Sequence, residues 1–182
     1  HVAQAIAAIA PHDSQERFEA LGVTVLRGWA RFTGPREVEA AGHLIRARRF
    51  VVATGSRPVT PQVPGIESVP VLTNEALFGL KDLPRHLLIL GAGPVGCEMA
   101  QAFRRLGSAA TLVEAGNPLS REDPAAAAVV LDSLRAEGIT LRSGAEIVRL
   151  RPVDEGLEAV LADGEGIPAR HPLAAAGPGA PP

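Results

Sequence analysis

Three glycines and one carboxylate carry the clearest chemical signal in this sequence. The stretch Gly91-Ala92-Gly93-Pro94-Val95-Gly96 fits the G-x-G-x-x-G pattern of dinucleotide-binding loops. Gly91 permits a tight turn, Gly93 leaves out the Cβ that would keep a pyrophosphate from the backbone, and Gly96 lets a helix lie close to a strand. A helix that begins at Pro94 would present free N–H groups and its positive dipole end to an anion.

The elements around these glycines are those that such a loop requires. Leu87 to Leu90 is a short apolar run typical of a buried parallel strand, and apolar residues recur at helical spacing from Met99 to Leu106. A second apolar strand, Ala109 to Val113, ends at Glu114, roughly 20 residues past the glycines. A carboxylate there accepts hydrogen bonds from the ribose hydroxyls of NAD and repels the 2′-phosphate of NADP. The competing interpretation is a structural glycine turn beside a solvated Glu.

Composition limits the remaining function classes. The chain has 182 residues, of which 46% are hydrophobic, and a net charge of −2, so we expect neither nucleic acid nor a membrane surface as a partner. Its single cysteine excludes an internal disulfide or a cysteine metal cluster, and the five histidines lack metal-ligand spacing. No apolar run has membrane-spanning length and no signal peptide precedes His1. We therefore expect a cytoplasmic protein, a piece of a longer chain.

The N-terminal part predicts two helices, a meander and two further strands. Val2 to Ile9 is predicted to be the end of a helix, and Ser14 to cap a second, short helix that Gly22 stops. Strands are predicted at Val23 to Leu26 and at Arg49 to Ala53. Between them, Trp29 to Ala47 alternates and turns at Gly34-Pro35 and Ala41-Gly42, which indicates a small antiparallel meander.

The C-terminal part continues the α/β pattern. Prolines from Pro58 to Pro70 predict a linker without regular structure, followed by a short helix capped by Thr73. Asp123-Pro124 predicts the start of a helix that Gly138 ends, and Ile139 to Leu141 a further parallel strand. Paired strands are expected at Ala145 to Val153 and Leu157 to Leu161.

A faint internal repeat aligns residues 47–55 with residues 169–177. Each segment follows a turn glycine and an alternating strand, which indicates two nucleotide-binding folds of one kind; coincidence in an Ala-rich chain is the alternative. Pro172 stands where the first copy has Phe50, and a proline is unfavourable in a central strand.

Together these motifs resemble the pyridine nucleotide-disulfide oxidoreductases, the FAD flavoproteins that include dihydrolipoamide dehydrogenase and mercuric reductase. The resemblance runs from His1 to about Leu161 and rests also on Ala53-Thr54-Gly55-Ser56-Arg57-Pro58, Thr73-Asn74-Glu75, residues 101–108 and Arg121-Glu122-Asp123. It implies hydride transfer between NAD(P)H and FAD, with electrons passing on to a cysteine pair. The contacts it implies are, for NAD, Gly91, Ala92, Gly93, Pro94, Val95, Gly96, Glu98, Glu114, Ile147 and Gly177, and, for FAD, Ala30, Thr54, Gly55 and Ser56.

Departures from the family pattern are as informative. The first FAD loop, the C-x-x-x-x-C segment and the dimerisation domain with its His-x-x-x-x-Glu pair are missing from these residues. Cys97 is no substitute, because in the first helix turn a small buried packing residue is expected. We expect the chain alone to bind NAD without turnover, in a parent that is a homodimer. A non-catalytic NAD-binding module, or a relative of NADH oxidases or flavin monooxygenases, is the alternative.

The predicted fold is therefore α/β, a doubly wound Rossmann-like NAD-binding domain preceded by part of an FAD-binding domain, as in flavoproteins with two dinucleotide-binding domains. Residues 1–58 are assigned to the partial FAD-binding domain and residues 59–80 to a Pro-rich crossing. Residues 81–177 form the NAD-binding domain, and residues 178–182 a loose tail.

Overall fold

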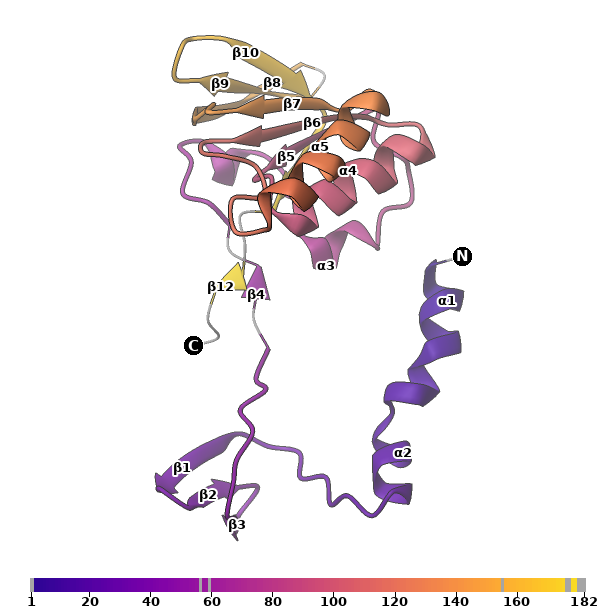
Figure 1. Cartoon of the computed structure of the whole chain (residues 1–182), viewed down its shortest axis with the longest axis vertical. Helices are drawn as coiled ribbons and strands as arrows, with labels where there is room; N and C mark the ends of the chain where they lie inside the picture. The colour runs from indigo at the N-terminus through magenta and orange to yellow at the C-terminus, as the bar shows by residue number, and fades with distance from the viewer. Residues whose placement is uncertain (1, 56, 59, 155, 176–177, 180–182) are drawn as a thin grey trace. The chain divides into compact units, whose positions relative to one another are not determined.

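A computed structural model describes residues 2–55, 57–58, 60–154, 156–175 and 178–179 of the chain. The chain divides into two compact units, His1–Thr54 and Gly55–Pro182 (Figure 1). Within the described residues, no helix is both long and apolar enough to cross a membrane. Nor do those residues include a group of three or more His, Cys, Asp or Glu side chains placed to hold a metal ion.

The N-terminal unit contains the predicted helices and meander. Ser14 caps the second helix, since its side chain accepts a hydrogen bond from the Arg17 N–H (3.2 Å), and Gly22 follows the helix with a φ of +85°. The strands form an antiparallel sheet in the order β1-β2-β3. The elements are α1 (Val2–Ile9), the 3-10 helix η1 (Ala10–Asp13), α2 (Gln15–Ala20), β1 (Ala30–Gly34), β2 (Glu37–Ala40) and β3 (His43–Arg46).

Two predicted strands of this unit are wrong. Val23 to Leu26 and Arg49 to Ala53 have no strand pairing, and Val51 is 91% exposed. Their apolar composition favours strands, but a strand exists only where a neighbour completes its hydrogen bonds. No such neighbour lies beside them in the described part of the chain. The first copy of the sequence repeat is therefore irregular, whereas the second contains a strand.

A four-stranded parallel sheet organises the C-terminal unit. Its order is β11-β5-β6-β7. The chain runs outward from β5 through β6 to β7 and later adds β11 on the opposite side of β5. The strand order therefore reverses at β5, which has β6 on one side and β11 on the other. Such a reversal is a topological switch point, and α/β sheets bind ligands there, at the carboxyl ends of their strands. The strands are β5 (His86–Leu90), β6 (Ala109–Glu114), β7 (Thr140–Ser143) and β11 (His171–Ala174).

The two faces of this sheet have different covers (Figure 1). Leu87 and Ile89 belong to a core cluster with α4 (Pro94–Leu106) and α5 (Pro124–Ala136). Leu88 and Leu90 instead pack with an antiparallel sheet of order β10-β9-β8. The predicted α/β class is confirmed, with a meander in place of helices on the second face. Its strands are β8 (Ile147–Val153), β9 (Gly156–Leu161) and β10 (Gly166–Ala169).

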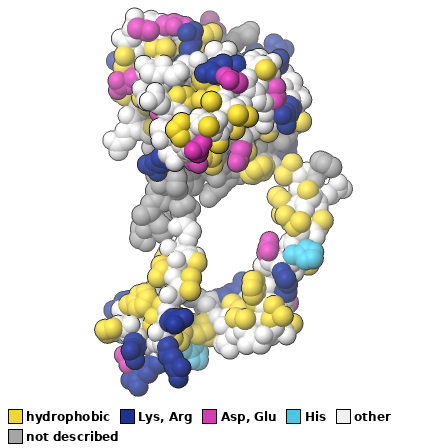
Figure 2. Space-filling view, in the orientation of Figure 1, with side chains coloured by type: hydrophobic (Ala, Val, Ile, Leu, Met, Phe, Trp, Pro, Cys, Tyr) yellow, Lys and Arg dark blue, Asp and Glu magenta, His cyan; other side chains and the backbone are white. Residues whose placement is uncertain are grey.

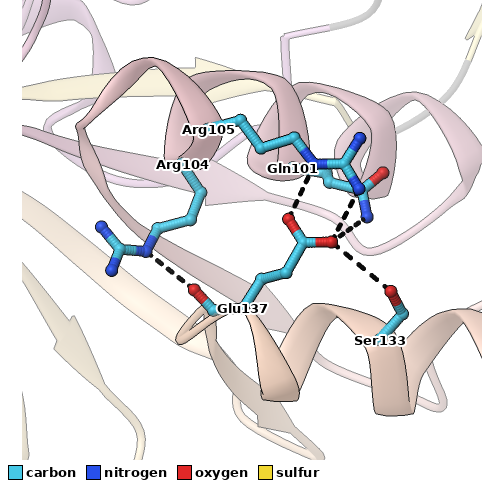
Figure 3. A network of polar contacts seen from close by, with 5 residues as sticks. All are labelled: Gln101, Arg104, Arg105, Ser133 and Glu137. Carbon is cyan, nitrogen blue, oxygen red and sulfur yellow. Dashed lines mark hydrogen bonds and ion pairs between the residues drawn. The ribbon is translucent and has the colours of Figure 1, made fainter.

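A capping residue fixes the start of α5, as the sequence predicted. The Asp123 carboxylate accepts hydrogen bonds from the N–H groups of Ala125 and Ala126, both at 3.0 Å, at the start of α5. Polar contacts then join the end of α5 to α4, where Arg105 forms an ion pair with Glu137 (2.8 Å) (Figure 3). These contacts position α4, the helix that follows the glycine loop.

The Pro-rich segment is better ordered than predicted. It contains a 3-10 helix, η2 (Ile66–Ser68), and the Pro64 carbonyl accepts a hydrogen bond from the Leu150 N–H (2.8 Å). Val69 is buried against the meander, so the segment packs on the unit. The helix α3 (Asn74–Leu77) follows, capped by the Thr73 side chain as expected.

Two end segments also differ from expectation. Of the predicted loose tail, Pro178 and Gly179 form β12 (Pro178–Gly179), which pairs with β4 (Arg57–Pro58), and residues 180–182 lie outside the described residues. Pro172 is accepted in β11, because its carbonyl points toward Leu72, whose N–H donates to it (2.8 Å). The N–H that proline lacks would point the same way, so the ladder between β11 and β5 loses no donor.

Candidate functional site

The glycine loop has the geometry that its three glycines were predicted to serve. Gly91 has a φ of +107°, and its N–H donates to the Val113 carbonyl (2.8 Å), which ties the loop to β6. A Cβ at Gly96 would lie 2.2 Å from the Gly91 carbonyl oxygen, so α4 approaches the loop this closely only with glycine. A Cβ at Gly93 would meet nothing within 4 Å. The space in front of the Gly93 backbone is therefore open, as a bound pyrophosphate requires.

The start of α4 offers free donors beside that open space. Gly93 is the N-cap residue and supplies no side-chain acceptor, and the first turn contains no acidic residue. The first N–H groups of the helix and its positive dipole end can therefore act on a bound anion. By contrast, α5 has the Asp123 carboxylate over its own first N–H groups.

Glu114 lies at the end of β6 and contacts the loop directly. Its carboxylate accepts hydrogen bonds from the Ala92 N–H and from the Gly116 N–H, both at 3.0 Å. Each carboxylate oxygen has a further lone pair, so the group can still accept a ribose hydroxyl. Glu114 thus shapes the glycine loop as well as presenting an acceptor to a ligand, a role that its position in the sequence did not reveal.

A cleft of about 420 Å³ joins these groups. A second cavity, of about 320 Å³, shares Gly91 and Glu114 with it and extends to Ile147. Backbone N–H donors for phosphate and a carboxylate acceptor for a diol are what a dinucleotide needs. The cleft is lined by Gly91, Ala92, Gly93, Pro94, Val95, Glu114, Asn117, Leu119, Ser120, Arg121, Glu122 and Ala175.

Cys97 is a packing residue, as predicted. Its side chain is 4% exposed, and the thiol lies 3.8 Å from the Ala92 carbonyl oxygen. Burial raises the pKa of the Cys97 thiol, and the nearby charge of Glu98 raises it further. The thiol therefore stays protonated at neutral pH and is a poor nucleophile.

The predicted NAD residues divide into groups. Five loop residues and Glu114 line one cleft, Gly96 forms the contact beneath it, and Ile147 lines the adjoining cavity. Glu98 is exposed on α4 and instead borders a groove of about 390 Å³ lined by α4 and α5 residues. Gly177 lies outside the described residues.

The predicted FAD residues that the structure describes are divided between the two units. Ala30 begins β1 and is exposed, and Thr54 ends the N-terminal unit. Gly55, with a φ of +71°, begins the C-terminal unit, and Ser56 lies outside the described residues. The FAD contacts remain a prediction.

Sequence reasoning missed the loop between β6 and α5 as a wall of the cleft. Asn117, Ser120 and Arg121 all line it. The loop is anchored to the glycine loop, because the Leu119 N–H donates to the Ala92 carbonyl (2.9 Å). Topology could have indicated this wall, since the loop follows the strand next to β5 at the carboxyl edge of the sheet.

Comparison with known proteins agrees with this geometry. The family model described as "Pyridine nucleotide-disulphide oxidoreductase" matches residues 8–182. The chain belongs to this family. It is 37% identical over 164 residues to a mercuric reductase of Streptomyces lividans, covering 86% of this chain and 35% of that protein. It is also 38% identical over 146 residues to a dihydrolipoyl dehydrogenase of Thermus scotoductus, covering 79% and 32%.

Solved structures show the same fold. The HOCl-induced flavoprotein disulfide reductase RclA of Escherichia coli matches 96% of this chain with a TM-score of 0.76 and 27% identity, over 42% of its own length. The chain thus spans about a third of the length of the two curated relatives described here. Pyridine nucleotide-disulphide oxidoreductases use FAD together with NAD(P)H, and the cleft has the donors and the acceptor that fit a pyridine dinucleotide.

Proposed function

We propose that this chain is the NAD-binding part, with a segment of the flavin-binding part, of an FAD-dependent oxidoreductase that passes a hydride between NAD(H) and FAD. The observation that carries the proposal is the cleft at the switch point of the sheet. There, the open face of Gly93, the uncapped start of α4 and the Glu114 carboxylate meet. The nicotinamide and the flavin supply the hydride chemistry when they are bound, and the protein binds and orients them.

Each group of residues has a distinct task in this proposal. The backbone from Gly91 to Gly96 holds the pyrophosphate, and Glu114 accepts hydrogen bonds from the ribose hydroxyls and favours NADH over NADPH. Ile147 and Gly177 make further NAD contacts, and Glu98 faces the nicotinamide. Ala30, Thr54, Gly55 and Ser56 contact the FAD.

We further propose that the 182 residues alone bind NADH without turning over. They contain one cysteine, Cys97, which is buried, so they hold no redox cysteine pair. The names of two relatives, mercuric reductase and dihydrolipoyl dehydrogenase, indicate two classes of substrate that exchange electrons with the flavin of the whole protein. We expect that whole protein to be a homodimer assembled through residues outside this chain.

Calorimetric titration of the chain with NADH, NADPH and FAD tests the proposal. We expect NADH to bind more tightly than NADPH, and Glu114→Ala to weaken NADH binding. Since Glu114 also bonds the Ala92 N–H, the variant is compared with Glu146→Ala, which removes a carboxylate that lines only the adjoining cavity. A folded chain that binds none of the three ligands would reject the proposal, and NADH–dye reductase activity with added FAD would reject its inactive part.

A further inference from the structure

The second cavity has a mostly apolar lining beside the proposed ribose acceptor. Its volume is about 320 Å³, and Leu90, Val113 and Ile147 are among the apolar residues that line it. Glu114 lines both this cavity and the cleft. The ribose that Glu114 is proposed to bind is the one that carries the adenine base. With the pyrophosphate at the start of α4, the adenine can therefore enter the second cavity.

Gln62 has the side chain in this cavity that can both donate and accept hydrogen bonds. One edge of adenine presents an acceptor, N7, next to a donor, the N6 amino group, and a side-chain amide can bond both at once. The other described residues with polar side chains that line the cavity are Glu114 and Glu146. An ionised carboxylate only accepts hydrogen bonds, so neither can pair with N6 and N7 together.

The segment that carries Gln62 is held against the meander of the C-terminal unit. The Pro64 carbonyl accepts a hydrogen bond from the Leu150 N–H (2.8 Å), and a Cβ at Gly65 would overlap the Leu150 carbonyl oxygen. Val63 packs against the core cluster on this face of the parallel sheet. The Gln62 side chain itself is exposed and forms no hydrogen bond with another described residue. Its backbone is thus positioned while its amide is available to a ligand.

We infer that the Gln62 amide binds the N6 and N7 edge of adenine and selects this base over hypoxanthine. The inference rests on the proposed function and adds a specificity-determining residue from the Pro-rich segment. Hypoxanthine has a carbonyl oxygen in place of the amino group, so the same edge presents two acceptors. The amide has one donor group and one acceptor group, so in either orientation one acceptor of hypoxanthine faces the amide oxygen.

Calorimetric titration with NADH and with reduced nicotinamide hypoxanthine dinucleotide tests the inference. We expect the wild type to bind NADH about tenfold more tightly than the hypoxanthine analogue. Gln62→Leu removes the amide but keeps an uncharged side chain of similar size. It should lose about tenfold in NADH affinity and bind the analogue as the wild type does. The matched control is Glu67→Leu, an exposed residue of η2 that lines neither the cleft, the second cavity nor the groove between α4 and α5.

The outcomes separate this inference from the proposed function. A wild type that binds NADH without preferring it to the analogue overturns the inference and leaves the proposed function standing, and this result needs no variant. The inference also fails if Gln62→Leu loses affinity equally for both ligands, or if Glu67→Leu loses the preference as Gln62→Leu does. If the folded wild type binds neither ligand, both proposals are overturned. Circular dichroism checks that each variant folds.

Discussion

Of the two loop glycines Gly93 and Gly96, the first is expected to matter for ligand binding and the second for folding. Both are needed by the same motif, but a methyl group added at each would meet different surroundings. At Gly96 the new Cβ would lie 2.2 Å from the Gly91 carbonyl oxygen. At Gly93 it would enter open space, and the backbone there (φ −76°) is one that any residue adopts.

Alanine at these positions should therefore have opposite effects. We expect Gly96→Ala to destabilise the fold by about 1–3 kcal/mol, the range of overpacked sites. Gly93→Ala should cost less than about 1 kcal/mol as a poorer N-cap, yet weaken NADH binding at least about tenfold, or 1.4 kcal/mol. Thermal unfolding and calorimetry on both variants measure the contrast. Undiminished NADH affinity in Gly93→Ala would show that no ligand approaches this backbone.

His86 makes the stability of the C-terminal unit depend on pH. It begins β5, its Nε2 lies 2.9 Å from the Thr111 hydroxyl, and burial lowers its pKa, with a hydrogen bond to the Pro168 backbone partly opposing that shift. Because the folded state binds the proton less readily than the unfolded state, stability is full above the ordinary pKa of 6.5 and declines as the pH falls below it. We expect His86→Gln to remove this decline between pH 7.5 and pH 5.5 in melting experiments, whereas the exposed His43→Gln should retain it.

Contacts between α4 and α5 act at the scale of whole elements. Figure 3 shows Glu137, at the end of α5, receiving side chains from α4. Arg105 donates to both carboxylate oxygens, each at 2.8 Å, and Gln101 to one of them (2.7 Å). Arg104 bonds the Glu137 carbonyl oxygen (2.9 Å), which satisfies an acceptor at the end of α5. The network therefore ties two helices, whereas Asp132 and Arg135 pair within α5 alone.

Removing the Glu137 charge should loosen this tie. The hydrogen bond from Arg105 is the main cause that lowers the pKa of Glu137. The ionised Glu137 carboxylate therefore stabilises the fold fully above the ordinary pKa of 4.5, and this stabilisation is lost as the pH falls through the lowered pKa. We expect Glu137→Gln to lower the melting temperature at pH 7, and the difference from wild type to vanish in acid. Asp132→Asn is the control and should change little, because exposed pairs contribute little. An equal loss in both variants would contradict a role that is particular to the network.

What the sequence could predict differs between elements for a physical reason. Helix caps such as Ser14 and Asp123, the glycine loop and the buried strand before it are local signals, and all were predicted correctly. The strands expected at Val23 to Leu26 and Arg49 to Ala53 failed, because strand formation depends on a distant partner. The cleft wall formed by the loop between β6 and α5 was missed for the same reason, since the hydrogen bond from Leu119 to Ala92 joins two loops that follow different strands. The predicted FAD contacts await a test.

At the scale of the whole molecule, the two units differ in how much they bury. The described residues of the N-terminal unit include two buried apolar side chains, Val38 and Ala40. Its helices bury none, and Trp29 is 88% exposed. Figure 2 shows hydrophobic side chains over the surfaces of α1 and α2. The C-terminal unit contains both core clusters, on the two faces of its parallel sheet.

Stability and NADH binding should therefore belong to the C-terminal unit. A unit with so small a core cannot offset the entropy of ordering its own chain. We expect limited proteolysis to remove residues before Gly55 first, and a chain that begins there to keep the melting temperature and NADH affinity of the whole 182 residues to within twofold in the dissociation constant. Mass spectrometry of the fragments over time shows the order of cleavage. A large loss of NADH affinity in the shorter chain would mean that the N-terminal unit contributes to the cleft, and that the glycine loop and Glu114 do not suffice as a binding site.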